Sequence, residues 1–445
     1  MGRHSAPGKR RASDQPGPSY QGLQGTSGEP EVVATTSHGG AGGVADGGSI
    51  RLWRRALAAL LIVGAIVTAV GVGLLWPSSE KPNVSPEFYT SFSLGQHQVD
   101  GHVVTMTPGA CTATELGKTF DDAPRVVPGS DSTCTWVITQ IDSGDNAGKR
   151  TLLINSGQVG EPELKVGEKI RLVEAADADG SLNYSFGDYQ RTTPLLAWLI
   201  LIAVAIILFA AWRGFRALIG LFVTMVVVAI FFLPAILHGA SPLLIAVFGG
   251  ALILYLVLFL VHGWNWKTAS ALGGTLIALC FSAVLAHFAI AQNQLRGLGD
   301  DNNLHIILYL PDVSVTGLML CGFIIGALGV LNDVAISQAS TVNELSELDP
   351  QASPWRLFLS AMDVGRDHIS SMVYTLVLSY TGASLPLLLL LSLSNRPITQ
   401  TLSSDIMSTE LLRSGIGALA LTLAVPITTM IAAFTAPNRE AKSTQ

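Results

Sequence analysis

The sequence predicts an α-helical polytopic membrane protein with about eight transmembrane helices and a small extracytoplasmic all-β domain between helices 1 and 2. Three observations lead to this fold class. Of the 445 residues, 49% are hydrophobic and only 13% are charged, with a mean hydropathy of +0.46, whereas soluble domains carry about 25% charged residues. The apolar residues gather in runs of about 20, the length that crosses a bilayer. Between the first two runs, apolar and polar residues alternate as in β-strands.

Eight apolar stretches are long enough to be spans. They cover residues 52–76, 194–212, 217–237, 243–262, 268–290, 313–331, 369–393 and 414–435. The first stretch follows three arginines, as a signal peptide does, but it is longer than the 7 to 15 residues of a signal core. We therefore expect residues 51–76 to be an uncleaved anchor helix.

Positive charges near the span ends predict the orientation. With the first span entering from the cytoplasm, most cations of the short connections fall on that side, and we expect both chain termini there, in a plasma membrane. The cations assigned to the cytoplasmic side are Arg51, Arg54, Arg55, Arg213, Arg216, Lys267, Arg356, Arg366, Arg439 and Lys442.

Residues 1–50 are rich in Gly, Ser and Pro and have almost no apolar pattern, so we expect a disordered cytoplasmic tail; residues 436–445 form a second cytoplasmic tail. Residues 77–193 are the sizeable soluble region. The runs "HVVTMTP", "CTWVITQI", "RTLLIN", "EKIRLVEA" and "NYSFGDYQR" predict five short strands in a small barrel or sandwich.

The four cysteines divide by compartment. Cys111 and Cys134 lie in the outer domain, where an oxidising environment favours a disulfide. Cys280 and Cys321 fall within spans and are expected to be small packing residues. No Cys or His spacing typical of zinc is present, so the sequence predicts no metal and no cofactor.

Residues 194–435 are expected to form a seven-helix bundle in which 313–345 and 363–393 cross near the centre. Small residues at Gly249, Gly250, Ser270, Gly273 and Gly274 predict close helix contacts. The loop 342–362 should be a short, partly helical connection. Residues 302–312 are too short to span and are expected to lie at the outer surface.

A polar face follows the sixth span. In "GALGVLNDVAISQAS", Asn332 and Asp333 come before the helical spacing has stopped. Asp333, Ser337, Ser340 and Glu344 follow at helical intervals, so they share one face if the helix continues past Leu331. We expect this amphipathic extension to end near "LDPQASP", because Pro350 and Pro354 stop it.

A second polar cluster precedes the seventh span, in "AMDVGRDHISSMVYT". An acid at the edge of the hydrocarbon is costly unless it is paired or hydrated, and an Arg or His nearby is the obvious counter-charge. The alternative is that these residues lie in the headgroup layer and anchor helix ends. The members are Asp363, Arg366, Asp367, His368, Ser371 and Tyr374.

The runs "GFIIGALGVLNDVAISQAS" and "AMDVGRDHISSMVYTLVLSYTGASLPLLLL" resemble the YibE/F family of multi-span bacterial membrane proteins. The long tail and outer β-rich domain are similar to those of its actinobacterial members. The resemblance covers about residues 98–435. It implies fold and topology, and it carries over no catalytic residues.

Two functions of different classes follow as hypotheses. The first is a permease or an ion- or proton-coupled transporter of a small solute, with Asp333 and the cluster at residues 363–368 lining the cytoplasmic mouth of its path. The second is an accessory or assembly protein that presents the outer β domain to an envelope partner. No catalytic motif or phosphate loop is present, so the sequence predicts no enzyme. The expected partners are the bilayer and an envelope protein or a second copy, and nucleic acid is excluded because there is no large basic block.

Overall fold

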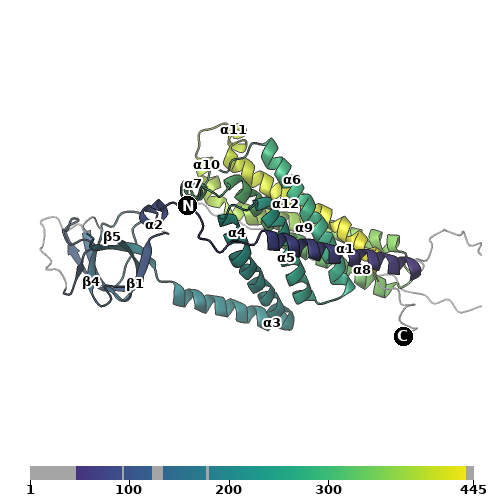
Figure 1. Cartoon of the computed structure of the whole chain (residues 1–445), viewed down its shortest axis with the longest axis horizontal. Coiled ribbons are helices and arrows are strands. Elements are labelled where there is room, and N and C mark those ends of the chain that lie inside the picture. Colours follow the sequence, from purple (N-terminus) through teal and green to yellow (C-terminus); the bar gives the residue numbers. More distant parts are fainter. Residues whose placement is uncertain (1–46, 93–94, 123–133, 177–179, 437–445) are drawn as a thin grey trace, which may run out of the picture. The chain divides into compact units, whose positions relative to one another are not determined.

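The computed structural model describes residues 47–92, 95–122, 134–176 and 180–436. It contains a small β domain followed by several long apolar helices (Figure 1), so this part of the predicted fold class is confirmed. The predicted tails lie almost entirely outside the described residues.

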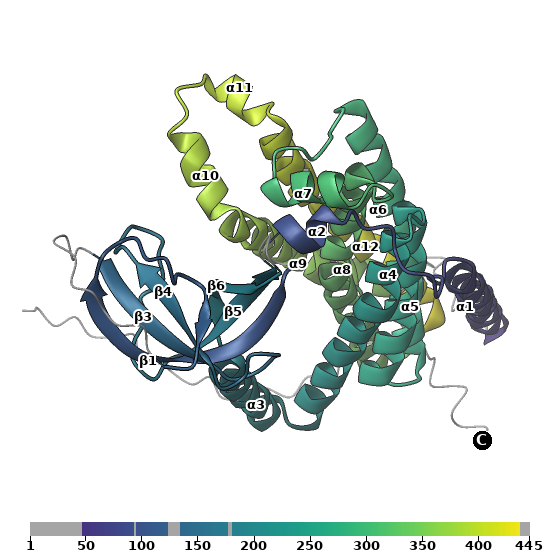
Figure 2. The same cartoon turned by 60° about the vertical axis from the view of Figure 1, so that its left-hand side comes forward.

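Six strands form one curved sheet, a half-barrel (Figure 2). Five coincide with predicted strands because each carries β-branched residues between turn residues; the two-residue β2 was not predicted. Neighbouring strands are antiparallel, in the order β2-β4-β3-β1-β5-β6. The strands are β1 His97–Gly109, β2 Thr119–Phe120, β3 Cys134–Ile141, β4 Arg150–Asn155, β5 Lys169–Ala176 and β6 Leu182–Tyr189.

Gly117 links β4 and β6, which are not neighbours in the order of this sheet. Its N–H donates to the carbonyl oxygen of Leu152 in β4 at 2.9 Å, and its carbonyl oxygen accepts from the N–H of Tyr184 in β6 at 2.8 Å. Its φ of +74° is a conformation that glycine adopts without steric cost. A single backbone position therefore bridges β4 to β6.

Burial alternates along the first half of β1, where Val99, Gly101 and Val103 face the core and their neighbours do not. This pattern is what a strand with one buried face requires. Near the far end of β1, Cys111 forms a disulfide with Cys134 at the start of β3, with their Cα atoms 5.1 Å apart.

Tyr184 is 2% exposed in the half-barrel core. Its hydroxyl donates to Oε1 of Glu174 at 2.5 Å and accepts from Nδ2 of Asn146 at 2.9 Å. Burial and the bond to Glu174 raise the pKa of Tyr184 to about 12, so the hydroxyl stays a neutral donor inside the core.

The rest of the described chain is helical. Its elements are α1 Gly47–Leu74, α2 Glu87–Ser91, α3 Thr192–Val227, the π-helix Val228–Phe232, α4 Leu233–Leu237, α5 Pro242–His262, α6 Trp266–Gln292, α7 Asp301–Tyr309, α8 Val315–Leu348, α9 Pro354–Ala383, α10 Leu385–Ser392, α11 Ile398–Leu402 and α12 Asp405–Thr435. Among the described residues, six helices are long and apolar enough to cross a membrane, and the bent pair α9–α10 makes seven if it is one span.

Polar side chains begin the long helices. Asn265, Ser314, Ser353 and Ser404 each accept a hydrogen bond from a backbone N–H of the first turn of α6, α8, α9 and α12. Such caps satisfy N–H groups that have no partner within the helix. In α9 the cap is followed by Pro354, whose fixed φ suits the first helical position.

The second and third predicted spans are separated, two residues earlier than expected. The sequence predicts a loop at 213–216, and the helical path from 192 to 237 is interrupted at Ala211, with φ 49° and ψ −134°. Without a break, its 46 residues would be about 69 Å long at 1.5 Å per residue, against about 30 Å of hydrocarbon. The length of the segment therefore requires a turn. The sequence does not indicate that the turn occurs at Ala211, because non-glycine residues rarely adopt a positive φ.

Three further boundaries differ from the prediction. The connection expected at 342–362 is shorter and covers residues 349–353, because α8 continues to Leu348 and α9 begins at Pro354. The predicted span 369–393 is two helices, α9 and α10, bent by 68°. The last span begins at Asp405 rather than at 414, so Arg413 belongs to a helix and not to a loop.

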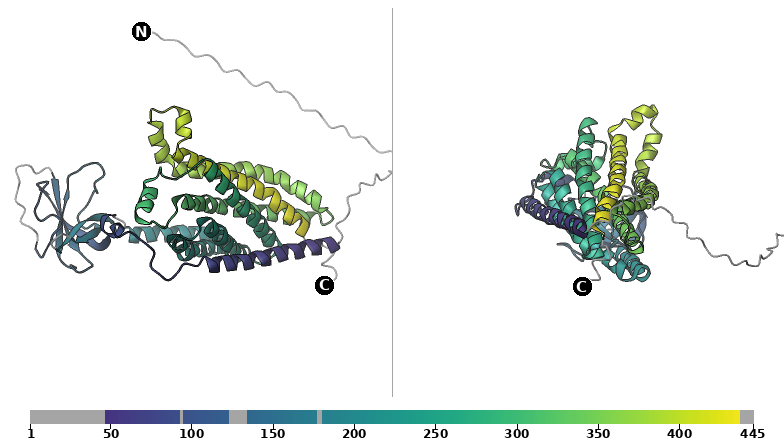
Figure 3. Two further views of the ribbon diagram at one scale, coloured as in Figure 1. Left: turned by 45° about the horizontal axis from the view of Figure 1, so that its top comes forward. Right: turned by 90° about the vertical axis from the view of Figure 1, so that its right-hand side faces the viewer.

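Helices α6, α8 and α12 pack side by side in the bundle (Figure 3). The close contact expected at Gly274 in α6 is present, since a Cβ there would overlap the side chain of Thr428 in α12. Gly249 in α5 likewise has no room for a side chain beside the Phe232 ring. Small residues therefore let these backbones approach, as is common in membrane bundles.

Candidate functional site

The polar face predicted on α8 exists as a helix face, because α8 runs through Asn332 and Asp333 to Leu348. Asp333 and Glu344 are exposed, while Asn332, Ser337 and Ser340 are half-buried. Among the described residues Asp333 has no hydrogen-bond or ion-pair partner, and Oδ1 of Asn332 is buried without a partner. The face is thus formed but largely unpaired.

The cluster on α9 is mostly exposed. Arg366 pairs with Asp363 at 3.0 Å, and their side chains are 70% and 76% exposed. Asp367, Ser371 and Tyr374 are exposed as well. An exposed ion pair within one helix contributes little to stability.

One contact joins the two predicted clusters. Oγ of Ser337 lies 3.5 Å from Nδ1 of His368. Arg366, the counter-charge that the sequence suggested for Asp333, makes its ion pair with Asp363 instead. The structure therefore brings together Ser337 and His368, but not Asp333 and Arg366.

A buried polar contact lies on the other face of α8 and was missed by sequence reasoning. Thr429 in α12 donates from Oγ1 to Oε1 of Gln338 at 2.9 Å, and both residues are fully buried. A Cβ on Gly365 in α9 would lie 3.0 Å from Nε2 of Gln338, so α9 also approaches here. The sequence does contain a pattern that indicates this contact. Gln338 follows Val334 by one helical turn, so a polar residue lies on an apolar helix face.

The opposite end of the bundle holds a second ion pair, and this one is mostly buried. Glu410 and Arg413 in α12 lie 2.9 Å apart, with 19% and 28% of their side chains exposed. The guanidinium of Arg413 lies 5.4 Å from the centroid of the Phe323 ring in α8. Charges inside a membrane helix are costly, so they are kept where they have a partner or a function.

This ion pair meets the break between α9 and α10. Ser384, the residue at the break, donates from Oγ to Oε2 of Glu410 at 3.0 Å. The glutamate thus bonds to Arg413 through one oxygen and to Ser384 through the other. We call Ser384, Glu410 and Arg413 the break cluster.

A pocket of about 450 Å³ borders the break cluster. Glu410, Arg413 and Pro386 line it together with Gly297 and residues 299–303. Asp405 also lines it, but its carboxylate accepts from the N–H groups of Arg296 and Leu298 at 3.0 Å each, which fixes the loop before α7. Glu410 and Arg413 are therefore the ion pair that lines the pocket from α12, a candidate membrane-spanning helix.

His238, just after α4, lies between two carbonyl oxygens. Its Nδ1 is 2.7 Å from the oxygen of Pro234 and its Nε2 is 2.9 Å from the oxygen of Glu80. A neutral imidazole donates through one nitrogen only, so the two acceptors favour the doubly protonated ring. Accordingly, the hydrogen bonds to Glu80 and Pro234 raise the pKa of His238 above its usual range.

Comparison with known proteins identifies the membrane part. A family model described as YibE/F-like protein matches residues 198–438, which is more than half of the chain. The chain belongs to the YibE/F-like family. No curated protein and no solved structure matches it.

The YibE/F-like region contains every residue named above from α8, α9, α10 and α12, including the break cluster. The half-barrel and α1 precede it. No group of three or more His, Cys, Asp or Glu side chains in the described part of this YibE/F-like protein is arranged to hold a metal ion.

Proposed function

We propose that this membrane protein is a permease or an ion- or proton-coupled transporter of a small solute, with the break cluster at its binding site. The observation that carries the proposal is the hydrogen bond from Ser384, at the interruption between α9 and α10, to Glu410 of the Glu410–Arg413 pair. A helix break, a charged pair and a pocket of about 450 Å³ coincide there.

General physical chemistry supports this choice. Non-helical backbone at membrane depth is tolerated only where protein buries it or water reaches it. Many secondary transporters place their substrate at such interrupted helices, where free backbone groups and ionisable side chains meet. The polar contact of Ser337 with His368, and Asp333 beside it, would then lie along the cytoplasmic part of the route.

The proposed orientation places both termini in the cytoplasm of a cell whose plasma membrane holds the protein. Its support is the gathering of Arg51, Arg54, Arg55 and Lys267 at the start of α1 and α6, since cytoplasmic ends carry an excess of Lys and Arg. The half-barrel then lies outside the cytoplasm, where a disulfide persists.

We propose no catalytic reaction and no nucleic-acid partner. Transport would run down a gradient or be coupled to an ion.

One observation favours a second candidate function. The half-barrel lies outside the YibE/F-like match and has its own hydrophobic core and disulfide. An accessory protein that presents this domain to an envelope partner would need the domain rather than the break cluster.

The transport proposal is tested by reconstituting the purified chain in liposomes. Proton flux would be followed with an entrapped pH dye, and a panel of inorganic ions and small solutes with solid-supported-membrane electrophysiology. Wild-type protein should produce a flux or current that Glu410→Gln and Arg413→Gln each reduce at least tenfold. The matched control is Asp188→Asn with Arg191→Gln, which removes another i,i+3 pair that is exposed and lies outside the YibE/F-like match.

If vesicles that contain the wild-type protein show no more flux than empty vesicles for any member of the panel, the transport proposal is excluded. Equal flux in the wild type and in Glu410→Gln would exclude the break cluster as its site. If, in cells, deletion of residues 97–189 removes a phenotype that Glu410→Gln preserves, the accessory function is the better account.

A further inference from the structure

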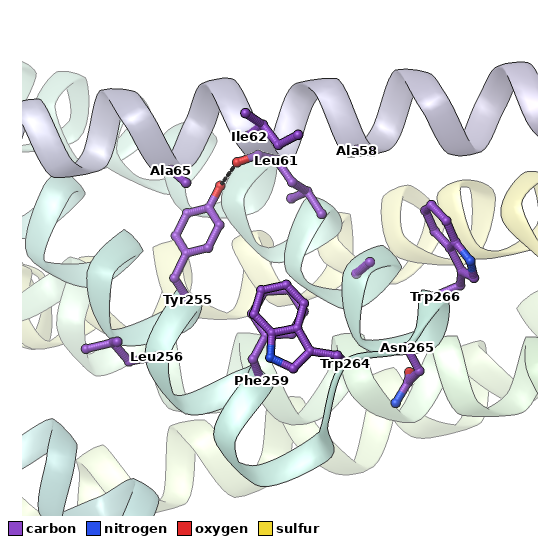
Figure 4. Close-up of a pocket in the computed structure, with 11 residues that line it drawn as sticks. Ala58, Leu61, Ile62, Ala65, Tyr255, Leu256, Phe259, Trp264, Asn265 and Trp266 are labelled. Atoms are coloured by element: carbon purple, nitrogen blue, oxygen red, sulfur yellow. Dashed lines mark hydrogen bonds between the residues drawn. The ribbon is translucent and has the colours of Figure 1, made fainter.

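A groove of about 660 Å³ lies between α1 and the turn that joins α5 to α6. Figure 4 shows its walls, with Leu61 and Ile62 of α1 across from Tyr255 and Phe259 of α5. Apart from Asn265 the lining is apolar or aromatic, so water gains few hydrogen bonds inside it.

One end of the groove is closed by a direct link between the helices. The hydroxyl of Tyr255 donates to the carbonyl oxygen of Leu61 at 2.7 Å (Figure 4). Gly64 permits this approach, because a Cβ there would lie 2.6 Å from the Tyr255 hydroxyl. The link holds the two walls of the groove together.

The other end carries tryptophans. Trp264 is 85% exposed and stacks on Phe259 with 4.0 Å between ring centroids, and Trp266 is 39% exposed. Tryptophan is enriched where membrane helices meet the headgroup layer. The open end of the groove thus has the composition of a membrane interface.

Positively charged residues lie beyond this end of the groove. Arg51 and Arg55 precede Ala58 and Ile62 by seven residues, which places them on the groove face of α1 one and two turns before it. Lys267, at the start of α6, lines a different pocket together with residues of α8 and α12, so it is not part of this rim. Arg55 takes part in no ion pair within the described ranges, and residues 47–76 and 242–299 contain no Asp or Glu.

We propose that this groove binds an acyl chain of an anionic phospholipid from the surrounding bilayer, with the phosphate held near Arg55. The apolar slot matches the acyl tail of such a lipid, the aromatic rim matches the membrane interface, and the exposed Arg55 matches the anionic headgroup. One wall is α1, which lies outside the YibE/F-like match. The proposal is therefore independent of the break cluster and of transport.

The test uses the full-length protein in nanodiscs made from equal amounts of phosphatidylglycerol and phosphatidylcholine. Lipid retained after detergent extraction is counted by native mass spectrometry. Each engaged cation should favour phosphatidylglycerol about fivefold, so the wild type should retain it at least fivefold over phosphatidylcholine. Arg55→Gln should bring that ratio toward one.

A filling variant tests the tail position separately. Ala58→Trp occupies the groove and should lower retention of both lipids, whereas Ala59→Trp, one residue away and exposed outside the lining, should not. Arg356→Gln is the charge control, because Arg356 is an exposed arginine on a helix that does not line the groove.

Two outcomes would overturn the proposal. One is equal retention of the two lipids by the wild type. The other is a lipid-free protein that elutes as a dimer, with Ala58→Trp and not Ala59→Trp dissociating it, which would assign the groove to a second copy of the chain.

Discussion

Arg54 in α1 donates from Nε to the carbonyl oxygen of Thr435, the last residue of α12, at 2.9 Å. The final carbonyl oxygens of a helix have no partner within it, and a cation there is favoured by the helix dipole. The same guanidinium lies 5.1 Å from the centroid of the Trp266 ring. The start of α1, the start of α6 and the end of α12 therefore meet at one end of the bundle.

This meeting predicts that both ends of the described chain face one side of the membrane. In a Cys280→Ser, Cys321→Ser background, Ser49→Cys and Ala436→Cys should react with a membrane-impermeant maleimide in inverted vesicles. Ser403→Cys, before α12, should react in right-side-out vesicles instead. Labelling of Ser49→Cys and Ala436→Cys from different sides would contradict the topology.

Thr429→Val should destabilise the bundle by about 1–3 kcal/mol, the cost of leaving a buried polar group unpaired, because it removes the donor to Gln338. Thr422→Val is the control, since the hydroxyl of Thr422 bonds only to Ala418 in its own helix. Equilibrium unfolding in mixed detergent measures both. Equal effects would mean that the Gln338 contact adds nothing.

Gly274→Ala should lower the unfolding free energy by about 1–3 kcal/mol, as overpacking does, because its Cβ would overlap Thr428. At Gly415 a Cβ would meet nothing within 4 Å. Gly415→Ala should therefore be neutral or stabilising by up to about 1 kcal/mol through helix propensity. Thermal unfolding curves compare the two, and the same shift for both would refute the close approach.

His238 should make stability depend on pH. The two carbonyl acceptors raise the pKa of His238 in the folded protein. Its contribution to the free energy of unfolding is therefore fully present below the pKa of the unfolded chain, about 6.5, and is lost as the pH rises through the folded pKa. Glu80, Lys81 and Asp312 line the same pocket. Between pH 5 and 9, the melting temperature should fall more in the wild type than in His238→Gln; parallel curves would argue against a protonated ring.

Replacing Cys111 and Cys134 by Ser should lower the stability of the half-barrel by about 2–4 kcal/mol, because their disulfide closes a 23-residue separation. Protease resistance of residues 97–189 in the full-length protein would report the change. The double change Cys280→Ser and Cys321→Ser, which touches two free thiols, should leave that resistance unaltered.

The sequence predicted the strands of the half-barrel within a few residues, and it predicted that α8 continues beyond Leu331 to the stop near Pro350. Both follow from local periodicity. It predicted the break between the second and third spans at 213–216, two residues after Ala211. It predicted one span over 369–393 and so missed the break at Ser384, because serine does not have the backbone preference of a helix breaker. It also missed Gln338, Glu410 and Arg413, whose importance depends on which helices approach them.

By itself, the sequence determined that this chain is a membrane protein with a β domain after its first apolar helix, since hydropathy and alternation are properties of consecutive residues. Only the tertiary structure decided which polar groups meet. Ser384 and Glu410 are 26 residues apart and Gln338 and Thr429 are 91 apart, so helix packing, and not spacing along one helix, brings each pair together.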